Sequence, residues 1–143
     1  MKSPKLIVGN VFSDARGNVF FNNEFDMLQI RRVYFIEHPD VSVIRAWQAH
    51  RFEQKWFQAV SGKFEVSLVK IDDWDNPSDK LPIIEFMLEA EKSEVLHIPE
   101  GYATGFKATE SFSKLMVMSD FTLEESKNDD YRFPVGKWKF ETK

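Results

Sequence analysis

The sequence predicts an all-β fold, a sandwich or barrel of short strands, on three observations. The chain has 143 residues, of which 43% are hydrophobic, enough for one domain over residues 1–143 with a sizeable core. Aromatic residues make up 15%, and 14 Phe suit the half-buried surfaces of sheets. Short apolar or alternating runs recur along the chain with turn residues between them, which is typical of all-β domains.

Strands are expected where these runs are bounded by turn residues. The clearest alternation places Phe64, Val66 and Leu68 on one face of a strand, with polar or charged residues on the other. The runs expected to form strands are Leu6–Phe12, Val19–Asn22, Arg32–Ile36, Val43–His50, Lys55–Val60, Phe64–Ile71, Ile83–Leu88, Val95–Ile98 and Leu115–Phe121.

Turn chemistry separates these runs. Residues 14–18 and 61–63 each contain a Gly that accepts positive φ, so both are expected to form hairpins. The longest polar interruption, residues 72–82, is expected to form a rim or lid. Near the C-terminus, Thr122 followed by Glu125 has the spacing of a capping box and predicts one short helix.

The composition excludes several partners and sites. A formal net charge of −4, with acids and bases interspersed, leaves no basic face for a nucleic acid. The chain has no run of about 18 apolar residues and no N-terminal apolar stretch of signal-peptide length, so no membrane partner is expected. Without Cys, disulfides and thiolate chemistry are excluded, and a cytoplasmic location is expected.

Two separated motifs carry the functional information. Metal-binding cupins present a His-x-His pair followed by Glu on one hairpin, and a last His after a Pro-x-Gly-x-x turn on another. The corresponding residues here are Gln48, His50, Gln54 and Thr104. Since Gln and Thr are weak neutral donors, one strong ligand remains, and neither a metal nor another cofactor is expected.

The chain resembles, over most of its length, the metal-free cupins that act on deoxythymidine-diphosphate (dTDP) sugars. These are the dTDP-4-dehydrorhamnose 3,5-epimerases and the dTDP-4-keto-6-deoxyhexose 3,4-ketoisomerases. The Asp-x-Arg-Gly turn of the epimerases is matched by residues 14–17, and their Arg-Gly-Leu-His by residues 45–48. A Lys before a Gly turn is matched by Lys55 with Gly62, and Pro-x-Gly-Phe-Ala-His-Gly-Phe by residues 99–106.

The chain departs from the epimerase pattern at two positions. Gln48 replaces the His that serves the epimerases as base, and Thr104 replaces the His of the second motif. The ketoisomerases have a His-x-His in the first motif, and His50 aligns with its second His. Retention of His50 therefore favours the ketoisomerase branch, or a sister group with its own signature.

The resemblance implies both a fold and an activity. The fold is a cupin double-stranded β-helix, or jelly-roll barrel, with a short C-terminal helical segment. The activity is a metal-independent isomerase or epimerase reaction on a nucleotide-linked 4-keto-6-deoxyhexose, in deoxysugar and surface-polysaccharide synthesis. Proton removal beside the ketone leaves an enediolate, and reprotonation gives either an epimer or a shifted ketone; the sequence does not choose between them. The family also implies a homodimer.

The resemblance further implies which residues meet the substrate. His50 is the expected base, since an unperturbed His titrates near neutrality. Lys55 is expected at the developing oxyanion, where fixed charge contributes most. The remaining candidates are Tyr102 as a catalytic phenol, Arg16 and Arg45 for the diphosphate, and Trp47, Gln48, Gln54 and Thr104 as further substrate contacts.

One geometric difficulty and two alternatives stay open. Along a regular strand, Gln48 and His50 share a face and Arg45 points the other way, so a bulge or barrel curvature has to bring them together. The first alternative is a non-catalytic module that binds sugar nucleotides or carbohydrate, which loss of the epimerase His favours. The second is a metal-dependent cupin oxygenase or isomerase.

Overall fold

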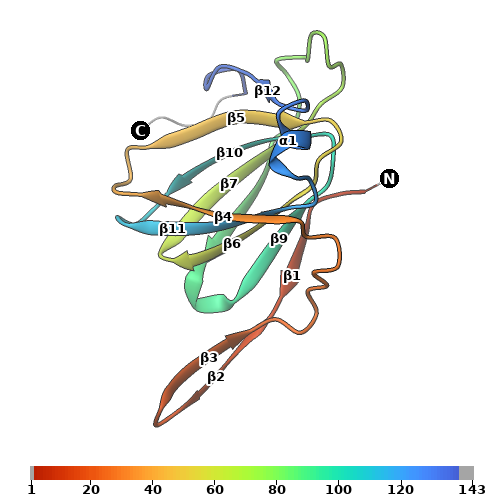
Figure 1. Ribbon diagram of the computed structural model, residues 1–143. Coiled ribbons are helices and arrows are strands. Elements are labelled where there is room, and N and C mark those ends of the chain that lie inside the picture. Colours follow the sequence, from red (N-terminus) through yellow and green to blue (C-terminus); the bar gives the residue numbers. More distant parts are fainter. Residues whose placement is uncertain (1, 139–143) are drawn as a thin grey trace.

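The computed structural model describes residues 2–138 and confirms the all-β expectation (Figure 1). The first antiparallel sheet has the strand order β1 (Lys5–Val8), β9 (Glu94–Ile98), β6 (Lys55–Ser61), β11 (Ser113–Ser119), β4 (Arg32–His38). The second has the order β12 (Tyr131–Arg132), β5 (Ile44–His50), β10 (Tyr102–Ala108), β7 (Lys63–Lys70), β8 (Ile84–Glu89). The remaining elements are the hairpin of β2 (Asn10–Asp14) and β3 (Gly17–Phe21), the 3₁₀ turn η1 (Ala90–Lys92) and the helix α1 (Leu123–Ser126).

Each run expected from the sequence contributes to a strand, and the structure adds two strands that were not expected. The first run is divided into β1 and β2 at Gly9. The unexpected strands are β10 and β12. Strand β10 lies between β5 and β7 in the second sheet and is buried at every residue except Lys107, so its sequence shows no polar-apolar alternation. Strand β12 has two residues, too few for a sequence pattern.

The main core lies between the two sheets. The predicted inward face of β7 is confirmed, since Phe64, Val66 and Leu68 have no exposed surface. They pack with residues of the first sheet, including Leu96 and Leu115. Burying each such side chain contributes roughly 1.5–3 kcal/mol, so this layer holds the two sheets together.

A second apolar cluster covers the outer face of β5. The C-terminal segment, residues 129–138, lies over this face together with the polar loop of residues 72–82. The Trp47 indole donates a hydrogen bond to Val135 O, at 3.1 Å, and the Trp138 indole donates one to Ser78 O, at 2.8 Å. Trp74 packs against Tyr131, with ring centroids 4.8 Å apart. The loop therefore fixes the C-terminal segment against the barrel.

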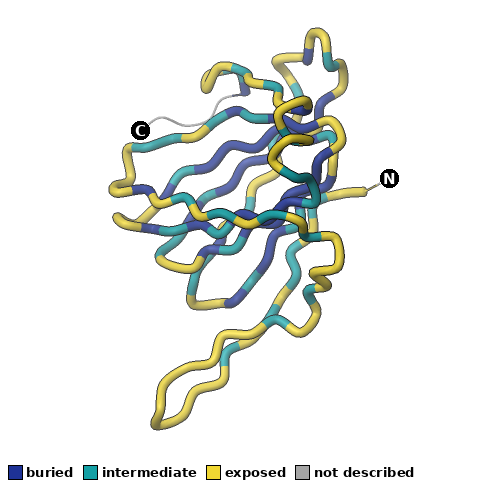
Figure 2. The backbone as a smooth tube through the Cα atoms, in the orientation of Figure 1, coloured by how far each residue is buried: buried dark blue, intermediate teal, exposed yellow. Residues whose placement is uncertain are grey.

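The predicted turns and the predicted cap are present. Gly17 and Gly62 have positive φ, and each sits in a hairpin turn. Thr122 and Glu125 form the capping box of α1. The β2–β3 hairpin projects from the barrel and exposes most of its residues (Figure 2). In residues 2–138, no helix has the length and apolar character to cross a membrane.

Replacement of Gly62 by Ala is expected to lower the free energy of unfolding by more than about 1 kcal/mol, because φ is +69° and the new Cβ would overlap the Ser113 side chain. Gly136→Ala is the matched control, since no atom lies within 4 Å of the added Cβ and its φ is not positive. Chemical denaturation of the two variants measures the difference. Equal stabilities would contradict the packing described for the β6–β7 turn.

Candidate active site

A cavity of about 520 Å³ lies between the two sheets, beside the edge strand β4. Sites for small molecules typically have volumes of roughly 300–1,000 Å³. Both sheets and the C-terminal segment contribute to its wall, which consists of Tyr34, Ile36, Ile44, Arg45, Ala46, Trp47, Gln48, Lys55, Phe57, Thr104, Phe106, Val117, Arg132 and Phe133.

A bulge in β5 brings Arg45 and Gln48 to the same side of the sheet. Gln48 pairs with Thr104 of β10, and the next pair joins Ala46 to Gly105, so Trp47 is the extra residue. This bulge reverses the alternation between positions 48 and 45. Arg45 and Gln48 therefore both line the cavity, and the geometric difficulty noted in the sequence is resolved as a bulge.

At one end of the cavity, Lys55 meets Tyr34. The Lys55 ammonium donates a hydrogen bond of 2.7 Å to the Tyr34 hydroxyl, and both side chains line the cavity. Tyr34 comes from β4, whose register with β11 places it opposite Val117. The Arg32 guanidinium lies 5.0 Å from the centroid of the Tyr34 ring. This end of the cavity therefore combines a positive charge with a hydroxyl that can both donate and accept hydrogen bonds.

Behind this pair lies Glu53, whose side chain has no exposed surface. One carboxylate oxygen, Oε2, accepts from the Arg32 guanidinium at 3.2 Å and from the Ser119 hydroxyl at 2.5 Å. The same oxygen lies 3.6 Å from the Lys55 ammonium. The other oxygen, Oε1, accepts from the Ser126 hydroxyl at 2.7 Å.

The Glu53 carboxylate stays ionised although it is buried. Burial by itself would raise the pKa of the carboxyl, but the Lys55 charge and the hydroxyl hydrogen bonds outweigh it. The pKa of Glu53 therefore lies below its ordinary value. The Lys55 ammonium is thus held between a buried carboxylate and the Tyr34 hydroxyl.

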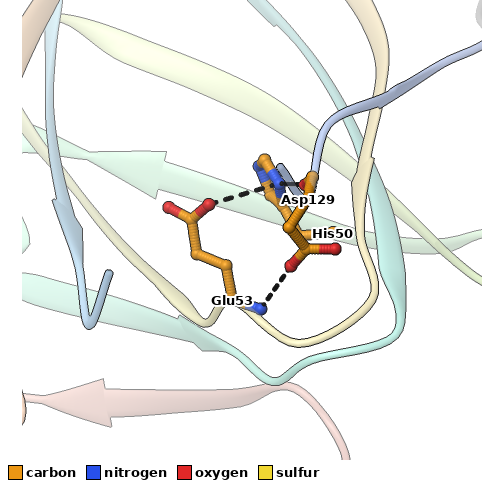
Figure 3. A group of neighbouring side chains, drawn as sticks. All are labelled: His50, Glu53 and Asp129. Carbon is orange, nitrogen blue, oxygen red and sulfur yellow. Dashed lines mark hydrogen bonds and ion pairs between the residues drawn. The ribbon is translucent and has the colours of Figure 1, made fainter. Parts of the chain in front are cut away.

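His50, the expected base, is enclosed beside Glu53 (Figure 3). Its Nδ1 donates to the Asp129 backbone carbonyl at 2.7 Å and lies 3.3 Å from Glu53 Oε1. Burial lowers the pKa of His50 and the Lys55 charge acts in the same direction, with Glu53 opposing them, so the imidazole is neutral near pH 7. His50 is not among the residues that line the cavity, and its Nδ1 is engaged by Glu53 and the Asp129 carbonyl.

Asp129 fixes the turn that carries these groups. Its carboxylate accepts hydrogen bonds from the backbone N–H groups of Arg51, Phe52 and Glu53, each at 2.8 Å. The turn between β5 and β6 therefore depends on a residue almost eighty positions later in the chain.

Ligand atoms of His50, Glu53 and Asp129 lie within 4.8 Å of one another, the spacing of a metal site. Each is already engaged: the imidazole Nδ1 with a carbonyl, Glu53 with hydroxyls and a guanidinium, and Asp129 with three backbone N–H groups. Two neighbouring cations, Arg32 and Lys55, also oppose a bound cation. This arrangement does not fit a metal ion.

Gln48 and Thr104 contribute neutral side chains to the cavity wall. The Gln48 amide donates to Asp130 at 3.1 Å, and the Arg132 guanidinium donates to the same carboxylate at 2.8 and 3.2 Å. These contacts, with Arg132 first, hold the pKa of Asp130 below its ordinary value. The Thr104 hydroxyl donates to the backbone carbonyl of Gln48 at 3.4 Å. The Gln48 amide cannot act as a base, so position 48 offers hydrogen bonds to the cavity but no proton acceptor.

Of the residues named from the sequence, the cavity brings together Arg45, Trp47, Gln48, Lys55 and Thr104. Four others lie elsewhere.

His50 is covered by the C-terminal segment, as described above. Tyr102 packs into the main core, because the strand it begins turns that side chain inward. Gln54 bonds to His97, at 2.7 Å, and to Asp120, at 3.0 Å, and is not part of the cavity wall. Arg16 lies on the projecting hairpin and binds Asp14.

Three residues of the site were missed in the sequence. Tyr34 and Arg132 line the cavity, and Glu53 joins Lys55 to His50. Glu53 lies within the first motif, between Arg51 and Lys55 in the sequence. This nearness to basic residues was the one signal that could have indicated its role. Tyr34 and Arg132 lie in segments with no motif, so no sequence signal indicated them.

Solved structures share this fold. A dTDP-4-dehydrorhamnose 3,5-epimerase from Bacillus anthracis, crystallised with TDP and PPi, is 17% identical and aligns with TM-score 0.74 over 93% of this chain and 79% of its own. QdtA, a sugar 3,4-ketoisomerase from Thermoanaerobacterium thermosaccharolyticum in complex with TDP, is 19% identical, with TM-score 0.70 over 94% and 90%. A dTDP sugar isomerase from Desulfovibrio desulfuricans is 18% identical, with TM-score 0.75 over 98% and 90%.

No protein-family model and no curated protein matches the chain. At these identities the structural likeness establishes the fold. The jelly roll implied by the sequence resemblance is therefore confirmed, including the short helix after β11.

Replacement of Glu53 by Gln is expected to lower the free energy of unfolding at pH 7 by about 3 kcal/mol, because Arg32 and Lys55 lose their shared counter-ion inside the protein. Because the folded pKa of Glu53 lies below its unfolded value, the stabilisation is present above about pH 4.5 and is lost as the pH falls further. Urea denaturation across pH 3–8 measures both effects.

The control is Glu124→Gln, which changes an exposed carboxylate paired with Lys127 on the surface. It should alter stability by less than about 0.5 kcal/mol at any of these pH values. A Glu53→Gln variant as stable as this control would show that the buried carboxylate contributes no net stabilisation.

Proposed function

We propose that this protein is a metal-independent isomerase or epimerase of a nucleotide-linked 4-keto-6-deoxyhexose, with the dTDP-linked sugar as the expected form. The observation that carries the proposal is the hydrogen-bonded pair of Lys55 and Tyr34 in the wall of a cavity large enough for a sugar. The fold supports it, because solved structures of the same fold are described as dTDP-sugar enzymes, two of them with TDP bound. A cytoplasmic place of action belongs to the same proposal.

The chemistry requires two things from the cavity. The enediolate formed beside the ketone carries negative charge, and the Lys55 ammonium supplies a fixed positive charge in a partly dry site. A second group has to take up and return the proton. Tyr34 can do this when it starts as the phenolate: it takes the proton from carbon and becomes the phenol, which then returns a proton to the enediolate. Both requirements meet at the Lys55–Tyr34 pair.

We assign the proton transfer to Tyr34 instead of His50. Tyr34 lines the cavity, whereas His50 is enclosed behind Glu53 with its Nδ1 bonded to a backbone carbonyl. In this assignment, neutral His50 and ionised Glu53 keep Lys55 in place. Gln48, Thr104 and Trp47 then contact the sugar without exchanging protons with it.

Cations elsewhere in the wall fit a diphosphate. Arg45 and Arg132 both line the cavity, and a guanidinium binds phosphate oxygens in a bidentate manner. The Arg132 guanidinium is already paired with the Asp130 carboxylate, so Arg45 is the stronger candidate for binding the diphosphate. Tyr102 and Gln54 have no place in this proposal, because neither is part of the cavity wall.

A second candidate function is binding without turnover. The specific observation in its favour is that Gln48, whose amide bonds to Asp130, stands in the cavity wall at the position where a proton-accepting His would serve an epimerase. Such a protein would bind the sugar nucleotide and leave its C–H bonds intact.

A partner is also proposed: a second copy of this chain. The β2–β3 hairpin exposes apolar side chains on both faces, with Phe12 and Val19 paired on one and Phe20 on the other. A two-stranded hairpin with apolar surface is not stable on its own in water. Arg16 lies on this hairpin, so its expected contact with a diphosphate depends on the second copy.

In D₂O with dTDP-4-keto-6-deoxyglucose, the protein is expected to incorporate deuterium beside the ketone. Tyr34→Phe and Lys55→Met should each slow incorporation by about 100-fold or more, since each removes one of the two required groups. His50→Gln should slow it by less than about 10-fold, the order expected of a group that does not transfer the proton itself. Nuclear magnetic resonance of the sugar measures the rates.

The control is Lys63→Met, which removes a lysine on the surface turn between β6 and β7. If His50→Gln abolishes exchange while Tyr34→Phe retains it, the base is His50. If dTDP raises the melting temperature but no deuterium enters the sugar, the protein is the binding module instead.

Phe12→Asp is expected to convert a dimer into a monomer at micromolar concentration, because it places a charge in the apolar hairpin surface. Light scattering after size-exclusion chromatography measures the mass. Phe112→Asp serves as the control, since Phe112 is also exposed but lies in the β10–β11 turn. A wild-type monomer would exclude the second copy as the partner of this hairpin.

A further inference from the structure

At the end of the cavity away from Lys55, a buried histidine contacts Arg45. His38 is the last residue of β4 and has no exposed surface. Its ring stacks on Phe106, with centroids 5.6 Å apart, and meets the edge of Phe64 at 5.4 Å. Phe106 also lines the cavity, so the ring is fixed directly behind the cavity wall.

The contact determines which His38 nitrogen carries the proton. The Arg45 Nε lies 3.2 Å from His38 Nε2 in hydrogen-bonding geometry. A guanidinium donates and does not accept, so Nε2 must present its lone pair and the proton must sit on Nδ1. Burial, followed by the Arg45 charge, lowers the pKa of His38, which keeps the ring neutral.

The remaining His38 nitrogen has no partner among residues 2–138. Nδ1 is buried and finds no acceptor in this part of the chain. Burying an N–H group without an acceptor is unfavourable, and such groups are rare in folded proteins. The position of the ring therefore provides a hydrogen bond for Nε2 and none for Nδ1. Its one polar contact is the acceptor that it offers to Arg45.

Arg45 differs from two other arginines of the site in having no carboxylate. Arg32 is paired with Glu53, and Arg132 is paired with Asp130. Within residues 2–138, no carboxylate oxygen lies within 4.0 Å of the Arg45 guanidinium, and its one hydrogen bond uses Nε. The Nη groups therefore keep their N–H donors for a ligand, on a side chain that lines the cavity.

We infer that His38 is a positioning residue, which holds Arg45 by its Nε so that the two Nη groups face the cavity and bind the diphosphate of the substrate. The inference rests on the proposed function. A guanidinium held at Nε presents its terminal pair of nitrogens as a planar fork, the geometry that matches two phosphate oxygens.

The position of His38 predicts which kinetic constant it affects. His38 lies four positions after Tyr34 in β4, about 13 Å along an extended strand. A change at His38 therefore acts on the anion end of the cavity and leaves the Lys55–Tyr34 end in place. Binding and KM should change, and kcat should not.

The test compares two substitutions of His38. His38→Phe keeps a ring between Phe64 and Phe106 but removes the acceptor, and is expected to weaken binding of dTDP and of inorganic pyrophosphate by about 10-fold, measured by calorimetry, with kcat within 2-fold of wild type. His38→Gln restores an acceptor oxygen and should recover part of the lost affinity.

A double-mutant cycle separates positioning from general damage to the fold. Arg45→Lys keeps the charge but has no Nε, so it should weaken pyrophosphate binding by a similar factor. In the Arg45→Lys background, His38→Phe should change the affinity by less than 2-fold, because the contact it removes is already absent. If the loss of affinity in the double variant equals the product of the two single losses, the two residues act independently and the inference is overturned.

The remaining outcomes are also decisive. If His38→Phe binds both ligands as tightly as wild type, or if it lowers kcat instead of affinity, the positioning role is overturned while the proposed function stands. If the wild-type protein binds neither dTDP nor pyrophosphate, the proposed function and the inference both fall. If His38→Phe does not fold, Arg45→Lys decides alone, and unchanged affinity in that variant overturns the inference.

Discussion

The buried carboxylate of Glu53 is the interaction on which the rest of the site depends. A fully buried charge is unfavourable unless opposite charges and hydrogen bonds surround it. Glu53 meets this requirement with groups from separate elements: Arg32 from β4, Lys55 from β6, Ser119 from β11 and Ser126 from α1. Satisfying one charge thus fixes β4, β6, β11 and α1 relative to one another at one end of the barrel, and the lysine that faces the cavity is fixed with them.

The cavity has two chemically different ends. Near Glu53, a lysine and a tyrosine hydroxyl are in contact, which suits the movement of a proton and the stabilisation of a developing negative charge. At the far end of β4, Arg45 presents donors that suit a bound anion. The rest of the wall is neutral or apolar except for Arg132, which is paired with Asp130. The two charged ends match the two groups of the proposed substrate that need them, the diphosphate and the reactive ketone.

The C-terminal segment is part of the site as well as a cover for the barrel. Asp129 accepts three backbone N–H groups of the β5–β6 turn, and Arg132 and Phe133 belong to the cavity wall. The hydrogen bonds of Trp47 and Trp138 hold the segment in place. The segment thus also encloses His50, because the Asp129 carbonyl that binds the imidazole comes from the same stretch of chain.

The sequence by itself determined the features that depend on neighbours along the chain. The alternation of β7 follows from the two-residue period of a strand, and the β6–β7 turn follows from the freedom of Gly62. The resemblance of the two motifs to the dTDP-sugar cupins implied Arg45, Gln48, Lys55 and Thr104 as site residues, and all four line one cavity. Tertiary structure decided which groups hold or face these residues. Tyr34, Arg132 and His38 lie in segments without a motif and reach the site through strand pairing and chain packing over dozens of residues. The bulge at Trp47 and the burial of His50 also depend on strand pairing and on packing between segments that are distant in sequence. Contact between residues distant in sequence follows from how the whole chain buries its apolar surface and its charges, and no local pattern contains that information.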